Sequence, residues 1–223
     1  MALEAAIRTA VTLSMLTAVS VAAEIPRFEV DPSWPKVPAK WKLGDASSVA
    51  VDAHDNIWVL HRPRTLSAGQ SAMAAPPVMV FDTRGNFIKA WGGAGTGYEW
   101  PEREHGIHID DKGYVWIGGN NCPARALPGL KPIGDDQLLK FTQDGKFVMQ
   151  IGHSSQSKGN ADTKNLHQPA DAVVYAKTNE LLSPTATGTI VSSSWTRIPA
   201  PSSECGAPSA TNRWITTSAL RRA

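Results

Sequence analysis

The chain has few charges, few cysteines and no large surplus of either sign. Of its 223 residues, 19% are charged, and the formal net charge is +2. This balance gives no reason to expect a nucleic acid partner. Two cysteines form at most one disulfide, which excludes a disulfide scaffold. With 42% hydrophobic residues, the chain has enough apolar material for one globular domain and too few charges for a disordered one.

Residues 1–23 have the order of a secretory signal peptide. Arg8 precedes an apolar run from Ala10 to Val21, and Ala23 ends the small-residue stretch after it. Charged residues then follow too soon for a transmembrane helix, which needs about 20 apolar residues. We expect cleavage after Ala23 and a secreted or periplasmic protein with no stable membrane insertion. An uncleaved anchor is the alternative.

The middle of the chain repeats itself in order. Ile109 lies about 58 residues after Val51, its counterpart in the preceding copy. A third copy opens at residues 172–174 and reaches residues 180–182. The first copy reads Val51-Asp52, Ile57-Trp58-Val59, Val80-Phe81, Gly85-Asn86-Phe87 and Ala90-Trp91-Gly92; the second reads Ile109-Asp110, Val115-Trp116-Ile117, Lys140-Phe141, Gly145-Lys146-Phe147 and Gln150-Ile151-Gly152.

Each copy contains four short apolar runs separated by turn residues, which predicts one four-stranded antiparallel sheet per copy. Such a sheet cannot bury both faces alone, so the copies must stack. We therefore expect an all-β fold, a partial β-propeller of two to three four-stranded blades over residues 45–182, preceded by a lead-in at 24–44. A β-sandwich is the alternative, but sandwich strands do not recur as whole four-strand units in the same order. A closed propeller has roughly four to eight blades, so this chain cannot close a ring unaided.

Residues 183–223 differ in composition, because most of them are Ser, Thr, Ala or Pro. This composition predicts a disordered low-complexity tail. A second explanation comes from the genetic code. Read one base early, Trp195-Thr196 encodes Asp, and permitted codons on both sides restore the missing half of a third blade. We hypothesise that the reading frame is broken near Leu182 and that a longer propeller was lost, which resequencing of the gene tests.

The repeats resemble NHL repeats, and more narrowly the peptidyl-α-hydroxyglycine amidating lyase family. The resemblance covers roughly residues 45–182. It implies a secreted six-bladed propeller that uses zinc and calcium to split a peptidyl hydroxyglycine into a peptide amide and glyoxylate. The matching segments are Val49-Ala50-Val51-Asp52, His61-Arg62, His105-Gly106-Ile107-His108-Ile109-Asp110 and residues 165–173.

This resemblance implies four site residues. His105 is one of three zinc-binding histidines, and Arg62 is the active-site arginine, whose planar fork suits a carboxylate. The backbone carbonyls of Val49 and Ile107 bind calcium, which takes oxygen ligands. The structural alternatives are a histidine bonded to backbone at a strand start for His105 and a solvated basic loop for Arg62.

The chain also departs from the family. The other two zinc histidines of the family lie in later blades, and its tyrosine base appears here only in the shifted reading frame. We therefore expect no catalysis from the chain as given. Zinc and calcium are the cofactors that the resemblance implies, and a truncated chain without bound metal is the alternative. The expected ligand is a small peptide or small molecule on the propeller face. The alternative function is a non-catalytic propeller that serves as a binding or interaction module, because the fold does not fix the function.

Overall fold

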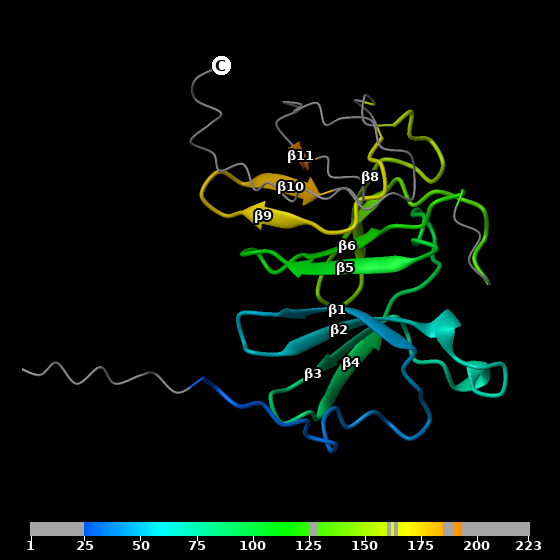
Figure 1. Ribbon diagram of the computed structural model, residues 1–223. Coiled ribbons are helices and arrows are strands. Elements are labelled where there is room, and N and C mark those ends of the chain that lie inside the picture. Colours follow the sequence, from blue (N-terminus) through cyan, green and yellow to red (C-terminus); the bar gives the residue numbers. More distant parts are fainter. Residues whose placement is uncertain (1–24, 125–128, 160–161, 163–164, 185–189, 193–223) are drawn as a thin grey trace, which may run out of the picture. The chain divides into compact units, whose positions relative to one another are not determined.

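The computed structural model describes residues 25–124, 129–159, 162, 165–184 and 190–192 (Figure 1). The predicted signal peptide and most of the predicted tail lie outside these residues. The chain separates into two units, Met1–Asp31 and Pro32–Ala223. The described residues of the first unit contain no regular secondary structure, and those of the second contain strands and two short 3-10 turns. Within the described part of the chain, no helix has the length and apolarity to cross a bilayer.

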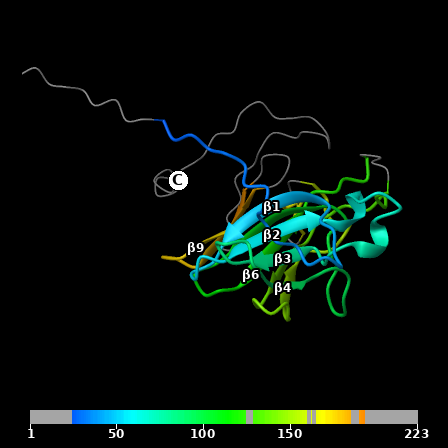
Figure 2. The same ribbon diagram turned by 90° about the horizontal axis from the view of Figure 1, so that it is seen from below.

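The first sheet contains four antiparallel strands in chain order, which can be followed in Figure 2. The loop from the second strand to the third holds both 3-10 turns, η1 (Pro63–Thr65) and η2 (Ser71–Met73). Because neighbouring strands run in opposite directions, the second and the fourth strand both finish at the end of the sheet where the first strand starts. The β2–β3 loop and the connection from β4 to the next sheet both lie there. The strands are β1 (Asp45–Val51), β2 (Ile57–Arg62), β3 (Val78–Phe81) and β4 (Phe87–Trp91).

The second sheet repeats this topology, and the third follows it with three described strands in the order β11-β10-β9. The fold is therefore all-β, a partial β-propeller of three blades, as the repeats predict. The third blade continues beyond residue 182, because Pro184 pairs with Ile190 and Leu182 with Ser192. The strands are β5 (Glu104–Ile109), β6 (Val115–Gly119), β7 (Leu138–Phe141), β8 (Phe147–Ile151), β9 (Val173–Tyr175), β10 (Glu180–Pro184) and β11 (Ile190–Ser192).

Aspartates at the β1–β2 and β5–β6 turns explain why the two copies fold alike. Oδ1 of Asp52 accepts two turn amides at 2.9 and 3.0 Å, and Oδ2 accepts the indole N–H of Trp58 at 2.9 Å. Asp110 accepts two turn amides at 3.0 and 2.8 Å and the indole N–H of Trp116 at 2.9 Å. Trp58 and Trp116 therefore occupy equivalent positions, which confirms the repeat.

The blades stack through shared apolar cores. One core combines Trp58 and Leu60 of the first blade with Ile117 and Phe141 of the second. The next core combines Trp116 of the second blade with Leu181 of the third blade and with Leu166 and Ala172 of the segment that precedes it. Each of the two recurring tryptophans, Trp58 and Trp116, thus packs against the blade that follows it. This arrangement excludes the β-sandwich alternative, because three sheets follow one another, each built from consecutive strands, whereas a sandwich has two sheets.

The opposite face of the first blade is covered by the lead-in. Residues alternate between the two faces of a strand, so Val59 and Phe81 point away from the core shared with the second blade. Trp34 and Trp41 of the lead-in pack there, with ring centroids 5.8 Å from Phe81 for Trp34 and 5.6 Å from Phe87 for Trp41. Residues 34–43 of the lead-in therefore pack onto the first blade.

Candidate functional site

Arg62 and His105, predicted from separate repeats, lie at the boundary between the first two blades. Arg62 ends β2, and its Nε donates a hydrogen bond to the backbone carbonyl of Glu104 at 2.9 Å. Glu104 directly precedes His105 in β5. Partial burial lowers the pKa of Arg62, and the nearby charge of Arg64 acts in the same direction. An arginine nevertheless stays protonated in a protein, so it brings a positive charge to this end of the blades.

The side chain of His105 is held in one orientation. Its Nδ1 lies 2.9 Å from the backbone carbonyl of Ala170. Because a carbonyl only accepts, Nδ1 carries the proton of the neutral ring and Nε2 keeps its lone pair. Burial lowers the pKa of His105, and the charges of Arg62 and Arg103 add to this effect against the Ala170 hydrogen bond. The imidazole is therefore neutral near pH 7.

A histidine that binds a metal almost always donates its other ring N–H to a carbonyl or carboxylate. His105 has this arrangement, so its form fits one zinc ligand. The same bond is also what the structural alternative, a histidine bonded to backbone at a strand start, predicts. The geometry of His105 is thus consistent with both interpretations.

The described residues do not supply a complete zinc site. Among them, no group of three or more His, Cys, Asp or Glu side chains is placed to hold a metal ion. Catalytic zinc typically takes three protein ligands. The neighbouring histidines are engaged elsewhere: His61 accepts the amide of Gly44 at 3.1 Å and contacts the carbonyl of Pro76 at 2.9 Å, and His108 accepts the amide of Val174 at 3.2 Å.

The two residues predicted to bind calcium lie on neighbouring first strands of their blades. Val49 pairs with Val59 in the first blade, and Ile107 pairs with Ile117 in the second. The amide of Ile107 is 3.4 Å from the hydroxyl of Ser48, which links β5 to β1. The structure therefore brings both residues to adjacent strands. Calcium takes about six to eight oxygen ligands, so two carbonyls do not complete its site.

Sequence comparison of the repeats missed Asp135, which organises the chain before His105. Its carboxylate accepts the amides of Glu102, Arg103 and Asn121 at 2.7, 2.9 and 2.8 Å. Burial raises the pKa of Asp135 to about 6, although these three bonds act to lower it. The strand register aligns Leu138 with Val78, so the position of Asp135 is taken by Ala75 in the first copy, and a search for recurring residues passes over Asp135.

Cys122, the only cysteine among the described residues, is buried and is not a free thiol. It therefore does not enter the candidate site.

Successive four-stranded sheets with shared cores define the protein as a partial β-propeller that places an arginine and a histidine at one blade boundary. No protein family model matches the chain, and no curated protein matches it. Eighteen solved chains match its structure. One is selenomethionine-substituted virginiamycin B lyase from Staphylococcus aureus, with 14% sequence identity and a TM-score of 0.32. The match covers 70% of this chain and 57% of that one, so this chain spans less than two thirds of its length. The assignment of the fold rests on the sheets themselves.

Proposed function

We propose that this chain carries the first blades of an exported NHL-type propeller lyase resembling the amidating lyases. The observation that supports the proposal is the placement of Arg62 beside the strand that holds His105. The two residues come from different repeats, and Arg62 donates a 2.9 Å hydrogen bond to the carbonyl of Glu104, the residue before His105. The family resemblance assigns roles to the same two residues.

In this proposal, His105 binds zinc through Nε2, because Nδ1 is already committed to Ala170. Zinc in such a site polarises a substrate hydroxyl. Arg62 uses its Nε to hold its position on β5, which leaves the two terminal nitrogens of the guanidinium for a carboxylate. The carbonyls of Val49 and Ile107 contribute to a calcium site. The ligand class is a small peptide with a carboxylate at the reacting end.

The remaining metal ligands do not occur among the described residues, so we propose that the chain as given does not catalyse the reaction. A protein with the reading frame restored after residue 182 is the form that tests the function. Loaded with zinc, it should release glyoxylate from a peptidyl hydroxyglycine, whereas the 223-residue chain should release none. Export is tested separately by N-terminal sequencing of the secreted protein, which should begin at Glu24.

Three variants of the restored protein separate the roles. His105→Ala should lose bound zinc and activity together. Arg62→Lys keeps the charge but loses the planar fork, so kcat/KM should fall about 100-fold. Loss of one charge-stabilising donor typically has an effect of this size in enzymes. His54→Ala, an exposed histidine in the β1–β2 turn, is the matched control and should change neither. A restored, zinc-loaded protein that releases no glyoxylate would refute the lyase proposal and favour the non-catalytic binding module.

A further inference from the structure

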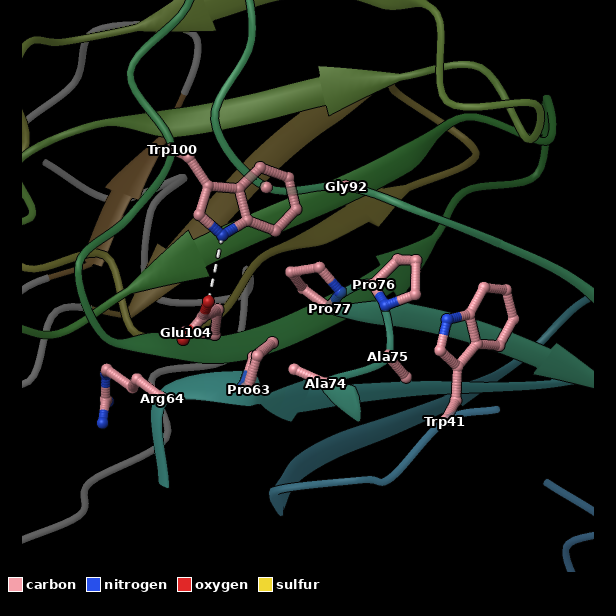
Figure 3. Close-up of a pocket in the computed structure, with 11 residues that line it drawn as sticks. Trp41, Pro63, Arg64, Ala74, Ala75, Pro76, Pro77, Gly92, Trp100 and Glu104 are labelled. Atoms are coloured by element: carbon pink, nitrogen blue, oxygen red, sulfur yellow. Dashed lines mark hydrogen bonds between the residues drawn. The ribbon is translucent and has the colours of Figure 1, made fainter. Parts of the chain in front are cut away.

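A second candidate site lies beside the first blade, and His105 does not line it. It is an open pocket at the surface with a volume of about 460 Å³ (Figure 3), a size typical of small-molecule sites. Its walls come from the lead-in, the β2–β3 loop, the β4–β5 connection and the start of β5. The lining residues are Trp41, Pro63, Arg64, Ala74, Ala75, Pro76, Pro77, Gly92, Gly93, Trp100 and Glu104.

The apolar part of the cavity is built from rigid side chains. Two indoles, of Trp41 and Trp100, and three prolines line it. Trp100 is fixed by a 3.0 Å hydrogen bond from its indole N–H to Glu104 and by packing on Gly92. Gly92 has φ +106°, and a Cβ there would lie 2.8 Å from the Trp100 ring, so only glycine fits. These walls are formed before a ligand arrives, which lowers the entropic cost of binding.

The polar part of the cavity holds one carboxyl group and one guanidinium. Glu104 is 5% exposed, and its Oε2 has no hydrogen-bond partner among the described residues. Such a buried, unpaired oxygen is costly unless a donor reaches it. Oε2 is shielded from water and Oε1 accepts the indole N–H of Trp100, so a ligand donor reaches the carboxyl either by sharing Oε1 or after a rotation about the last torsion of the side chain, which has a broad energy profile.

Arg64 faces the same cavity from its rim. Its Nε donates to the backbone carbonyl of Glu102 at 3.0 Å. Its charge acts on the carboxyl of Glu104, and burial, the larger effect, raises the pKa of that carboxyl. The described residues nevertheless show no ion pair between Arg64 and Glu104. Figure 3 shows the two side chains near each other and Trp41 at the far side of the cavity.

This arrangement discriminates between classes of ligand. A simple cation meets the positive charge of Arg64, and a simple anion meets the carboxyl of Glu104. A ligand with one positive and one negative group close together satisfies both, and its apolar part occupies the space between the indoles and prolines. We propose that the cavity binds a free α-amino acid with an apolar or aromatic side chain, its ammonium group on Glu104 and its carboxylate on Arg64. This proposal does not depend on the proposed lyase function.

Isothermal titration of the 223-residue chain with L-phenylalanine tests the proposal. Two analogues, phenethylamine and 3-phenylpropanoate, keep the ring and lack the carboxylate or the ammonium. Phenylalanine should bind at least tenfold more tightly than either analogue. Equal binding of an analogue, or no binding of phenylalanine at millimolar concentration, would overturn the proposal.

Substitutions then test the two polar groups. Glu104→Gln keeps an oxygen for the Trp100 hydrogen bond and removes the charge, and Arg64→Gln removes the other charge. Each should weaken phenylalanine binding at least tenfold. Arg84→Gln, which removes an exposed arginine in the β3–β4 turn, should leave binding unchanged. If thermal melts show that Glu104→Gln is unfolded, Arg64→Gln decides the outcome alone, because Arg64 is exposed at the surface. Unchanged binding in the folded variants contradicts the assignment.

Discussion

Asp52 is the residue on which the first hairpin most depends. Burial alone raises the pKa of Asp52, but hydrogen bonds from Asn56, Trp58 and the turn amides outweigh it and lower the pKa to about 2. The charged carboxylate is therefore the form that the folded state favours. Its contribution to stability is fully present above its ordinary pKa of 3.8 and is lost as the pH falls towards 2.

We expect Asp52→Ala to lower the free energy of unfolding by about 2–4 kcal/mol, because the buried indole N–H of Trp58 and two turn amides lose their acceptor. Urea unfolding followed by circular dichroism measures the loss. Asp82→Ala is the control, since Asp82 binds the corresponding amides of the β3–β4 turn at 2.9 and 2.8 Å but no indole. It should lower the free energy of unfolding by less than Asp52→Ala does. Equal losses in the two variants would show that the tryptophan bond contributes nothing.

Asp135 responds to pH in the opposite sense. Its pKa rises from 3.8 to about 6 on folding because of burial. Between these values the folded state keeps a proton that the unfolded state has released, so this contribution to stability falls as the pH rises. Wild type should therefore lose stability relative to Asp135→Asn between about pH 4 and pH 6. Urea midpoints of both proteins across this range measure the difference.

The comparison with Asp52→Asn is the internal control for that measurement. Wild type should gain stability relative to Asp52→Asn as the pH rises between about 2 and 3.8, because the pKa of Asp52 is lowered. The two difference curves therefore have opposite slopes. Parallel curves for wild type and Asp135→Asn would mean that the three amide bonds compensate fully for the burial of the charge.

At the scale of elements, two glycines let the chain before the third blade lie directly on the second. A Cβ at Gly106 would meet the carbonyl oxygen of Ala170 at 2.5 Å, and one at Gly118 would meet that of Pro169 at 2.1 Å. Neither distance is tolerated between real atoms, so backbone contact here requires glycine. The same Ala170 carbonyl accepts the hydrogen bond from His105. Packing between β5, β6 and the segment at residues 169–171 therefore sets the orientation of the His105 side chain, the candidate zinc ligand.

Gly118→Ala should push residues 169–171 away from β6 and destabilise the third blade by about 1–3 kcal/mol. Hydrogen exchange should become faster at β9, because β9 follows the displaced segment, and stay unchanged at β2 and β3 of the first blade. Gly69→Ala is the matched control, since a Cβ there has no atom within 4 Å. Uniformly faster exchange over all three blades would instead indicate a single cooperative unit.

The elements that recur were predictable, and those that occur once were not. Val51-Asp52 and Ile109-Asp110 with their tryptophans predict two sheets, and the structure confirms them. The resemblance indicated Arg62 and His105, and the structure brings their strands together. The repeats did not indicate three residues, because none of them recurs with the same contacts in the other copy: Trp41, Glu104 and Asp135. Their roles arise from contacts between distant segments, which repetition does not reveal.

At the scale of the whole molecule, the described blades leave apolar side chains exposed where further blades of a propeller pack. Val173 and Tyr175 of β9 are 48% and 42% exposed, and Val49 and Val51 of β1 are 58% and 56% exposed. Apolar strands left open in this way favour association between chains. We expect the apparent mass of the 223-residue chain to rise with concentration in sedimentation experiments.

Two variants test whether these surfaces cause the association. Val173→Lys places a charge on β9 and should lower the apparent mass, whereas Lys146→Gln, in the β7–β8 turn, should not. The protein with the restored reading frame should stay monomeric over the same concentrations. A 223-residue chain that remains monomeric throughout would show that its described blades are already covered.

The covering of the first blade by the lead-in affects how any ring would be sealed. Because Trp34 and Trp41 occupy part of the side of the sheet turned away from the second blade, an incoming final blade would meet their indole rings as well as the exposed Val49 and Val51 of β1. A ring completed in this way depends on the segment from Trp34 to Leu43. Removing the chain as far as Trp41 would uncover Phe81 and Phe87 on that face, while leaving the core between the first two blades in place.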